Sequence, residues 1–202
     1  MNLANKITLI RIILVPIFIL FVTPMPHWLV DKSVVLQVIS NYHLVIATGI
    51  FIVAAITDKL DGYIARKYNQ ITAFGCFLDP LADKLMIISA LVFLVQDKKI
   101  AGWIALIIIG RELAVTGLRG LAAMNHKVLA ADKYGKAKLV FQVITIPLYL
   151  LNNYPFSLIT SFPFADVMMF FTLIITVLSG VNYFVKNKDV FYENGKILSN
   201  NL

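Results

Sequence analysis

The chain has 202 residues, of which 59% are hydrophobic and 14% are charged, and its mean hydropathy is +0.82. Soluble domains have about 45–50% apolar and about 25% charged residues, so this composition argues against a water-soluble globule and also against a disordered chain. The single cysteine, Cys76, excludes an intrachain disulfide, and the net charge of +7 fits charged membrane loops better than nucleic-acid binding.

Stretches without a charged residue mark the expected membrane spans, because a bilayer core about 30 Å thick requires about 20 helical residues. Four stretches are long enough by themselves, namely residues 12–30, 33–57, 139–165 and 167–185. Two shorter runs, 85–96 and 100–110, reach full length only when they are extended. The first extends back through Asp83 and Asp79, and the second extends forward through Arg111 and Glu112 to about residue 126. We therefore expect an all-α integral membrane protein with six transmembrane helices in one domain, residues 1–202.

The distribution of basic residues sets the expected orientation, since cytoplasmic loops of membrane proteins carry an excess of Lys and Arg. With a cytoplasmic N-terminus, Lys32, Lys98 and Lys99 fall outside, and the other fifteen of the eighteen basic residues lie on or toward the inside. The 152–163 segment, which contains no Lys or Arg, fits the outer face. Both termini are therefore expected in the cytoplasm.

Four aspartates form the most informative pattern of the chain. Asp58 and Asp61 are spaced i, i+3, and Asp79 and Asp83 are spaced i, i+4, so each pair lies on one helix face. The short loop around residues 69–72 makes the two helices antiparallel neighbours, which brings the pairs to the same depth near the cytoplasm. Four carboxylates at that range repel one another unless cations neutralise them. Because ligands that offer only oxygen favour Mg²⁺ or Mn²⁺ over zinc, we expect two of these cations.

Small residues and one arginine flank the aspartates. Gly62, Ala65 and Arg66 share a stripe beyond the first pair, and Gly75 lies one turn before the second, so a ligand could approach the backbone closely. Arg66 can reach back as a phosphate clamp. Such a site suits displacement at phosphorus, in which metals hold the bridging and leaving oxygens. Asp83 is the group best placed to accept a proton from an attacking hydroxyl.

The pattern D-x-x-D-G-x-x-A-R, followed after eight residues by G-x-x-x-D-x-x-x-D, resembles the signature of the CDP-alcohol phosphatidyltransferase family. The positions that match are Asp58, Asp61, Gly62, Ala65, Arg66, Gly75, Asp79 and Asp83. Sequence similarity to the family extends to Asn5, Thr8 and Arg11 near the N-terminus and to residues 110–112 and Arg119 further along. The resemblance therefore covers the chain from near residue 2 to about residue 140.

The resemblance implies a multi-pass enzyme of the cell membrane, usually a homodimer, whose site opens to the cytoplasm and to the surrounding lipid. It implies that Asp58, Asp61 and Asp79 bind the metals, and that Asp83 lies close to the metals as a further ligand and acts as general base. The residues that would contact CDP-diacylglycerol are Asn5, Thr8, Gly62, Ala65, Arg66 and Gly75. The primary hydroxyl of glycerol 3-phosphate would attack the β-phosphorus of CDP-diacylglycerol, giving phosphatidylglycerol phosphate and CMP.

Charges inside the expected fourth span point independently to the acceptor. Glycerol 3-phosphate is a dianion, whereas serine, choline and inositol carry no phosphate, so this acceptor requires an additional cationic pocket. Arg111 lies about half-way across the bilayer, where an unpaired arginine costs at least about 2.5–3.5 kcal/mol. Arg119 follows near the same helix face, and Lys136 and Lys138 begin the fifth helix. We expect these four residues to bind the phosphate of glycerol 3-phosphate.

Other interpretations stay open at the level of the sequence. Arg111 can instead pair with Glu112 or another carboxylate in a structural role. A different acceptor would make the protein a cardiolipin synthase or a phosphatidylserine synthase of the same family. A divalent-cation transporter would use the aspartates to bind its transported ion, although the acidic cluster lies at one end of the bundle and no acidic pathway continues it outward.

Overall fold

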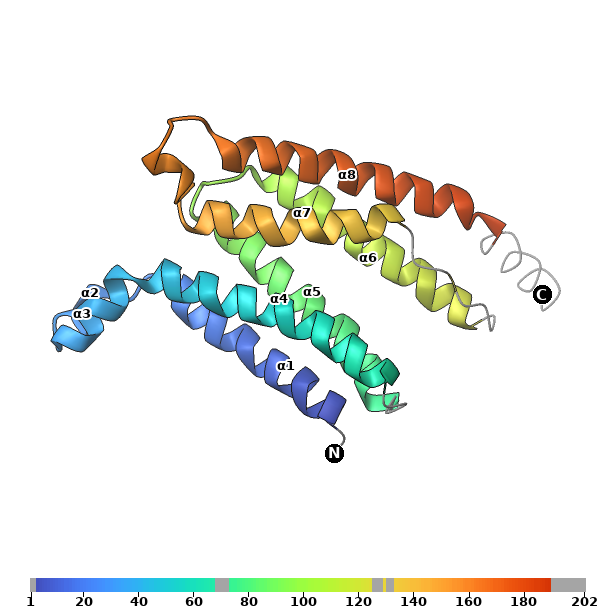
Figure 1. The fold of residues 1–202 in the computed structure, drawn as a ribbon, viewed down its shortest axis with the longest axis horizontal. Coiled ribbons are helices and arrows are strands. Elements are labelled where there is room, and N and C mark those ends of the chain that lie inside the picture. Colours follow the sequence, from blue (N-terminus) through green and yellow to red (C-terminus); the bar gives the residue numbers. More distant parts are fainter. Residues whose placement is uncertain (1–2, 68–72, 125–128, 130–132, 190–202) are drawn as a thin grey trace. The chain divides into compact units, whose positions relative to one another are not determined.

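The computed structural model describes residues 3–67, 73–124, 129 and 133–189, and for residues 3–8, 27, 58–67 and 73–83 it describes only the backbone. Every regular element in this part of the chain is a helix (Figure 1). The expectation of an all-α protein is therefore confirmed.

Six helices in the described part have 18 residues or more, which is the number of expected spans. They are α1 (Leu3–Val22), α4 (His43–Lys67), α5 (Ala73–Gln96), α6 (Gly102–Met124), α7 (Lys133–Leu150) and α8 (Phe164–Lys186). Three short elements connect them: α2 (His27–Val30), α3 (Val34–Asn41) and the 3-10 helix η1 (Phe156–Leu158).

The helix bounds differ from the charge-free stretches where local chemistry intervenes. The first helix ends at Val22 instead of near residue 30, because Pro24 and Pro26 lack a backbone N–H and restrict the residues before them. The stretch 33–57 breaks at Tyr42 into α3 and α4, whose axes differ by 63°. The stretch 139–165 ends as a helix at Leu150, where two asparagines with positive φ, at positions 152 and 153, turn the chain.

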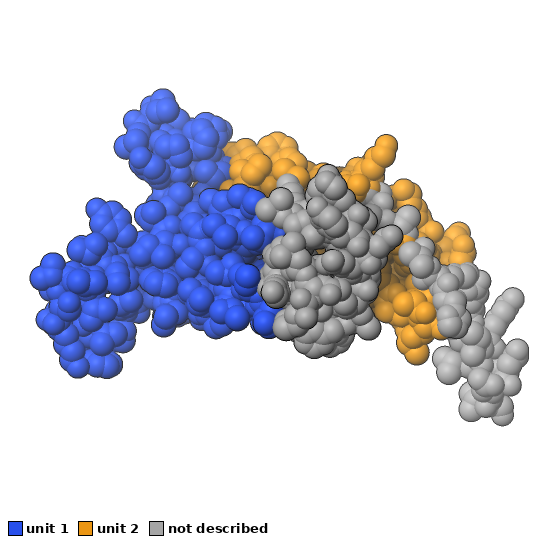
Figure 2. Space-filling view, turned by 60° about the horizontal axis from the view of Figure 1, so that its bottom comes forward, with its two compact units in different colours: residues 1–100, 146–165 blue, residues 101–145, 166–202 orange. Residues whose placement is uncertain are grey.

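The chain divides into two compact units, which Figure 2 shows in different colours. Unit 1 comprises residues 1–100 and 146–165, and unit 2 comprises residues 101–145 and 166–202. The expectation of one domain over residues 1–202 stays a prediction.

In unit 1, α1 packs against both α4 and α5. The ring centroids of Phe18 on α1 and Phe51 on α4 are 6.1 Å apart, and both rings are buried. The Nδ1 atom of His43 lies 3.1 Å from the carbonyl oxygen of Phe21, where α1 ends and α4 begins. Figure 1 shows that α1 starts at the same end of this group at which α4 ends and α5 begins. Helix α1 therefore lies against both helices that carry the aspartates.

In unit 2, α6 and α8 meet around a core of Val115, Leu118, Ala122 and Tyr183. The hydroxyls of Thr145 on α7 and Thr172 on α8 form a 2.9 Å hydrogen bond. This bond fixes the register between α7 and α8.

The distribution of side chains is that of a membrane protein. Large apolar side chains such as Leu106, Met124 and Val181 are exposed. The polar side chains buried in the described part are Arg11, Thr48, Lys138, Gln142, Thr145, Thr172, Thr176 and Ser179. Helices in lipid expose apolar residues and turn polar ones toward each other, so the many exposed apolar side chains and the buried polar ones support a membrane environment.

Length and composition identify fewer spans than expected. Within the described residues, α8 is long and apolar enough to cross a membrane, and the bent pair Val34–Asn41 and His43–Thr57 counts as a second if it forms one span. Helix α6 contains Arg111, Glu112 and Arg119, and α7 begins with three lysines, so charges lower the apolar character of both. Six spans and cytoplasmic termini stay predictions.

Candidate active site

The four aspartates lie on two neighbouring elements of unit 1. Asp58 and Asp61 belong to α4, and Asp79 and Asp83 belong to α5, where the structure describes their backbones. Asp61 and Asp79 each lie six residues from the helix end that borders residues 68–72, which corresponds to about 9 Å at 1.5 Å per residue. The two pairs are therefore at similar distances from the connection between their helices, as the sequence predicts.

The donor chemistry of these aspartates fits a divalent cation. Among the side chains that the structure describes, no group of three or more His, Cys, Asp or Glu residues is arranged to hold a metal. The side chains of the four aspartates lie outside the described part of the chain. Carboxylate oxygens are hard donors of the kind that Mg²⁺ and Mn²⁺ bind. The assignment of these residues as metal ligands stays a prediction.

The residues predicted to contact CDP-diacylglycerol also belong to unit 1. Asn5 and Thr8 lie in the first turns of α1. Gly62, Ala65 and Arg66 lie near the end of α4, and Gly75 lies near the start of α5. All six side chains lie outside the described part. Their backbones belong to the helix ends that Figure 1 places together.

Arg11 is a feature of unit 1 to which the sequence analysis assigned no role. Its side chain is 2% exposed, on the helix that packs against α4 and α5. Burying a cation is costly unless it is paired and hydrogen-bonded. In the sequence, Arg11 is a charged residue directly before a long apolar stretch, and this position could have indicated a role inside the helix group. The structure shows that the Arg11 side chain is buried instead of facing solvent.

Unit 2 contains a buried cluster of charged groups centred on Glu112. Its Oε1 atom forms an ion pair with Nζ of Lys138 on α7 and lies 3.5 Å from Nη1 of Arg111. The Nη2 atom of Arg111 donates a 2.6 Å hydrogen bond to Oγ of Ser179 on α8. Side chains from α6, α7 and α8 therefore meet at this point. The pairing of Arg111 with Glu112, one of the alternatives above, is present in the structure.

Glycines make room for the Arg111 side chain. A Cβ atom added at Gly180 would lie 3.1 Å from Cγ of Arg111. A Cβ atom added at Gly135 would lie 3.7 Å from Nη2 of Arg111 and 3.9 Å from Oγ of Ser179. The arginine therefore passes close to the backbones of α7 and α8.

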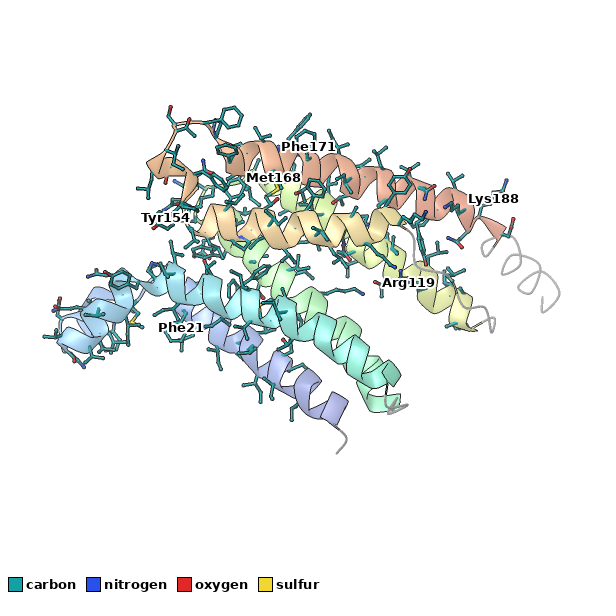
Figure 3. All side chains as sticks on the ribbon, in the orientation of Figure 1. Phe21, Arg119, Tyr154, Met168, Phe171 and Lys188 are labelled. Carbon is teal, nitrogen blue, oxygen red and sulfur yellow. The ribbon has the colours of Figure 1, made fainter. Side chains whose placement is uncertain are left out.

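Arg119 lies on the same face of α6 as Arg111, as the eight-residue spacing predicts. Its Nε atom donates a 3.0 Å hydrogen bond to the hydroxyl of Tyr183, and its guanidinium lies 5.4 Å from the centre of that ring. Figure 3 labels Arg119 among the side chains of the described residues. Ser179 and Tyr183 are four residues apart, so one face of α8 receives both arginines.

The two lysines of the predicted acceptor pocket have different environments. Lys136 is exposed, whereas the side chain of Lys138 is 1% exposed. Residues two positions apart on a helix point to different sides. The structure thus buries Lys138, half-buries Arg111, and leaves Arg119 and Lys136 exposed at the surface of unit 2.

Comparisons with known proteins agree with the residues described above. The sequence profile of the CDP-alcohol phosphatidyltransferase family matches residues 1–178. The chain is 46% identical over 190 residues to the CDP-diacylglycerol–glycerol-3-phosphate 3-phosphatidyltransferase of Bacillus subtilis, covering 92% of this chain and 95% of that protein. It is 37% identical to a probable phosphatidylglycerophosphate synthase of Mycobacterium tuberculosis, covering 90% of this chain and 79% of that protein. It is 29% identical to the CDP-diacylglycerol–glycerol-3-phosphate 3-phosphatidyltransferase of Rickettsia felis, covering 94% of this chain and 97% of that protein.

Proposed function

The chain belongs to the CDP-alcohol phosphatidyltransferase family, and from that premise we propose that it transfers the phosphatidyl group of CDP-diacylglycerol to sn-glycerol 3-phosphate. The products are phosphatidylglycerol phosphate and CMP. The observation that carries this function is the 46% identity, over 92% of the chain, to a Bacillus subtilis protein named for the same reaction. The protein is thus an enzyme of phospholipid biosynthesis.

The charges of unit 2 support an acceptor that carries a phosphate. Arg111 and Arg119 both point toward α8 from one face of α6. Arginine binds phosphate oxygens in a bidentate manner and lysine binds them as a point charge. We assign the phosphate of glycerol 3-phosphate to the neighbourhood of Arg111 and Arg119, with Lys136 at the exposed side. Acceptors such as serine or inositol have no phosphate with which to use these cations.

The aspartates of unit 1 account for the chemistry of transfer. Asp83 takes the proton from the primary hydroxyl of glycerol 3-phosphate, and the hydroxyl oxygen forms a bond to the β-phosphorus of CDP-diacylglycerol. The bond between that phosphorus and the oxygen bridging to the CMP phosphate breaks, and CMP leaves with the electron pair. Arg66 contacts the diphosphate of the donor. Asn5, Thr8, Gly62, Ala65 and Gly75 line the CDP moiety.

Divalent cations belong to this proposal as a consequence of the donor set. Asp58, Asp61, Asp79 and Asp83 would hold two Mg²⁺ or Mn²⁺ ions. When bound, these ions supply charge stabilisation at the bridging and leaving oxygens of the diphosphate. The carboxylates in turn lose their mutual repulsion.

The arrangement in the membrane extends the proposal. The exposed apolar side chains and the distribution of basic residues support a multi-pass protein of the cell membrane, with six spans, both termini in the cytoplasm and the site facing the cytoplasm. The matched residues 1–178 include helices of both compact units, which supports one catalytic domain. A homodimer in contact with membrane lipids is the expected state, and nucleic acid is not a partner.

The test of this function is a product assay with the purified protein, CDP-diacylglycerol and a panel of acceptors. We expect phosphatidylglycerol phosphate from glycerol 3-phosphate and little product from serine, inositol or phosphatidylglycerol. Use of serine or of phosphatidylglycerol in preference would assign the protein to another branch of the family. Removal of divalent ions by chelation should abolish product formation, and addition of Mg²⁺ or Mn²⁺ should restore it, whereas activity that survives thorough chelation would refute the metal-assisted mechanism.

A further inference from the structure

The connection between α1 and α4 places large apolar side chains at the surface of unit 1. Trp28 of α2 is 65% exposed and Val34 of α3 is 74% exposed. Val35, Val38 and Tyr42 are exposed as well. Positions 34, 35, 38 and 42 recur at helical spacing, so these four side chains share one side of α3, which we call the α3 apolar face. Exposure of such a face to water is unfavourable, so it indicates contact with an apolar phase.

The other side of α3 and its start are polar. Gln37 and Asn41 are exposed and lie one helical turn apart. Ser33 caps the helix by accepting a 3.3 Å hydrogen bond from a backbone N–H of the first turn. Asp31 and Lys32 directly precede this cap and are exposed. Polar and charged groups are costly in the core of a bilayer, so the polar side of α3 requires contact with water.

Aromatic residues of the kind found at membrane surfaces lie at both ends of the segment. Trp28 belongs to α2, and Tyr42 caps the end of α3. The Nζ atom of Lys32 lies 5.0 Å from the centre of the Trp28 ring. Trp and Tyr are enriched where a membrane meets water, and lysine keeps its charged end in water while its stem covers an apolar surface. This set of residues is typical of the headgroup layer.

The geometry of α3 and α4 agrees with this depth. Helix α4 has 25 residues, which corresponds to about 37 Å at 1.5 Å per residue, so it can cross a bilayer core of about 30 Å without α3. The axis of α3 differs from that of α4 by 63°. With α4 along the membrane normal, α3 therefore lies closer to the membrane plane than to the normal. Both short helices lie beyond the start of α4 (Figure 1).

We propose that α2 and α3 lie in the headgroup layer of the membrane, at the surface opposite the aspartates, with the α3 apolar face turned toward the lipid chains. Lipid is the occupant of this face, and Gln37 and Asn41 face water. The second span then begins at His43 instead of residue 33. Because α4 is one continuous helix, an anchor at its start also fixes the depth of the aspartates near its other end. The inference is independent of the reaction that these aspartates serve.

The first experiment measures the reactivity of cysteines introduced on the two sides of α3. Val35→Cys and Gln37→Cys form a matched pair, because residues two positions apart point to different sides of a helix. Each variant is placed in lipid nanodiscs, whose two surfaces are both open to solvent, and is treated with a charged maleimide. The wild type, in which Cys76 is the single cysteine, gives the background. We expect the thiol of Val35→Cys to react about tenfold more slowly than that of Gln37→Cys, since withdrawing an apolar side chain from lipid is unfavourable.

The second experiment measures the depth of Trp28 by fluorescence quenching. The chain has two tryptophans, so Trp103→Phe leaves the signal of Trp28 alone. The nanodiscs contain phospholipids that carry bromine either near the headgroup or near the end of the acyl chain. We expect Trp28 to be quenched by both lipids, and more strongly by bromine near the headgroup. Should Trp103→Phe not fold, the difference in signal between the wild type and Trp28→Phe gives the same comparison.

Three results would overturn the proposal. Rapid labelling of both cysteine variants without quenching of Trp28 would place α3 in water. Slow labelling of both variants, with stronger quenching from the chain ends, would place α3 in the core as part of a bent span. Slow labelling of Val35→Cys without quenching of Trp28 would mean that a second copy of the chain covers the α3 apolar face. A wild type that does not use glycerol 3-phosphate refutes the proposed function and leaves both measurements unchanged.

Discussion

The space at Gly180 gives a quantitative test of how tightly Arg111 is held. A methyl group at this position would lie 3.1 Å from Cγ of Arg111, closer than ordinary van der Waals contact. The hydrogen bond to Ser179 and the ion pair with Glu112 hold the far end of the arginine, so Cγ cannot move away freely. Gly180→Ala should therefore force either the arginine or helix α8 to shift.

The magnitude follows from two opposing contributions. Replacing a helical glycine by alanine stabilises a protein by about 0.5–1 kcal/mol where the added methyl group meets nothing. Overpacking of a well-packed site costs about 1–3 kcal/mol. Gly180→Ala should therefore lie between no change and a loss of about 2.5 kcal/mol. The guanidinium should be displaced, and the KM for glycerol 3-phosphate should rise.

The matched controls are Gly117→Ala on α6 and Gly49→Ala on α4, because a Cβ atom at either glycine has no neighbour within 4 Å. Unfolding of each variant in detergent, followed with increasing temperature, gives the change in stability, and steady-state kinetics gives the KM. Both controls should gain stability and keep the wild-type KM. If Gly180→Ala gains as much stability as the controls and keeps the wild-type KM, the account of a confined arginine is refuted.

Two further predictions concern the transfer step and the second arginine. Asp83→Asn should lower turnover by about 10²-fold or more, the usual scale for loss of a general base, while equilibrium binding of CDP-diacylglycerol is retained; equal losses in donor affinity and turnover would make Asp83 mainly a metal ligand. Tyr183→Phe removes the hydroxyl that accepts the bond from Arg119 but keeps the ring, so it should raise the KM for glycerol 3-phosphate by less than Arg119→Gln does. Equal KM values for these two variants would contradict a role for the guanidinium beyond the Tyr183 contact.

The described part of the chain contains six helices of 18 residues or more, the number of spans that the sequence predicts, although six membrane spans stay a prediction. The sequence predicted the ends of these helices less well. The two prolines after Val22 and the asparagines after Leu150 are visible in the sequence and explain two of the differences. The break at Tyr42 is not visible in this way, since the residues around it include no proline or glycine, and the contact of His43 with Phe21 depends on tertiary packing.

The candidate site shows the same division between local and tertiary information. The helical period of 3.6 residues places Arg111 and Arg119 on one face, and both arginines do contact α8. The period also separates Lys136 from Lys138, yet it does not indicate which of them is buried. Only the position of Glu112 on a different helix decides that, because a carboxylate at that place can neutralise Lys138 and not Lys136.

The distribution of charge among the helices of unit 2 explains why composition alone finds few spans. The face of α8 that turns inward carries hydroxyl groups at Thr172, Thr176, Ser179 and Tyr183, which are three or four residues apart and uncharged. Helix α8 therefore has the hydropathy of an ordinary membrane span while it accepts hydrogen bonds from arginines. The charges themselves come from α6 and α7, so the helices that carry the predicted acceptor pocket are less apolar than α8. Uncharged hydroxyls on an apolar helix can therefore hold the guanidinium groups of a neighbouring helix at little cost to the insertion of the apolar helix.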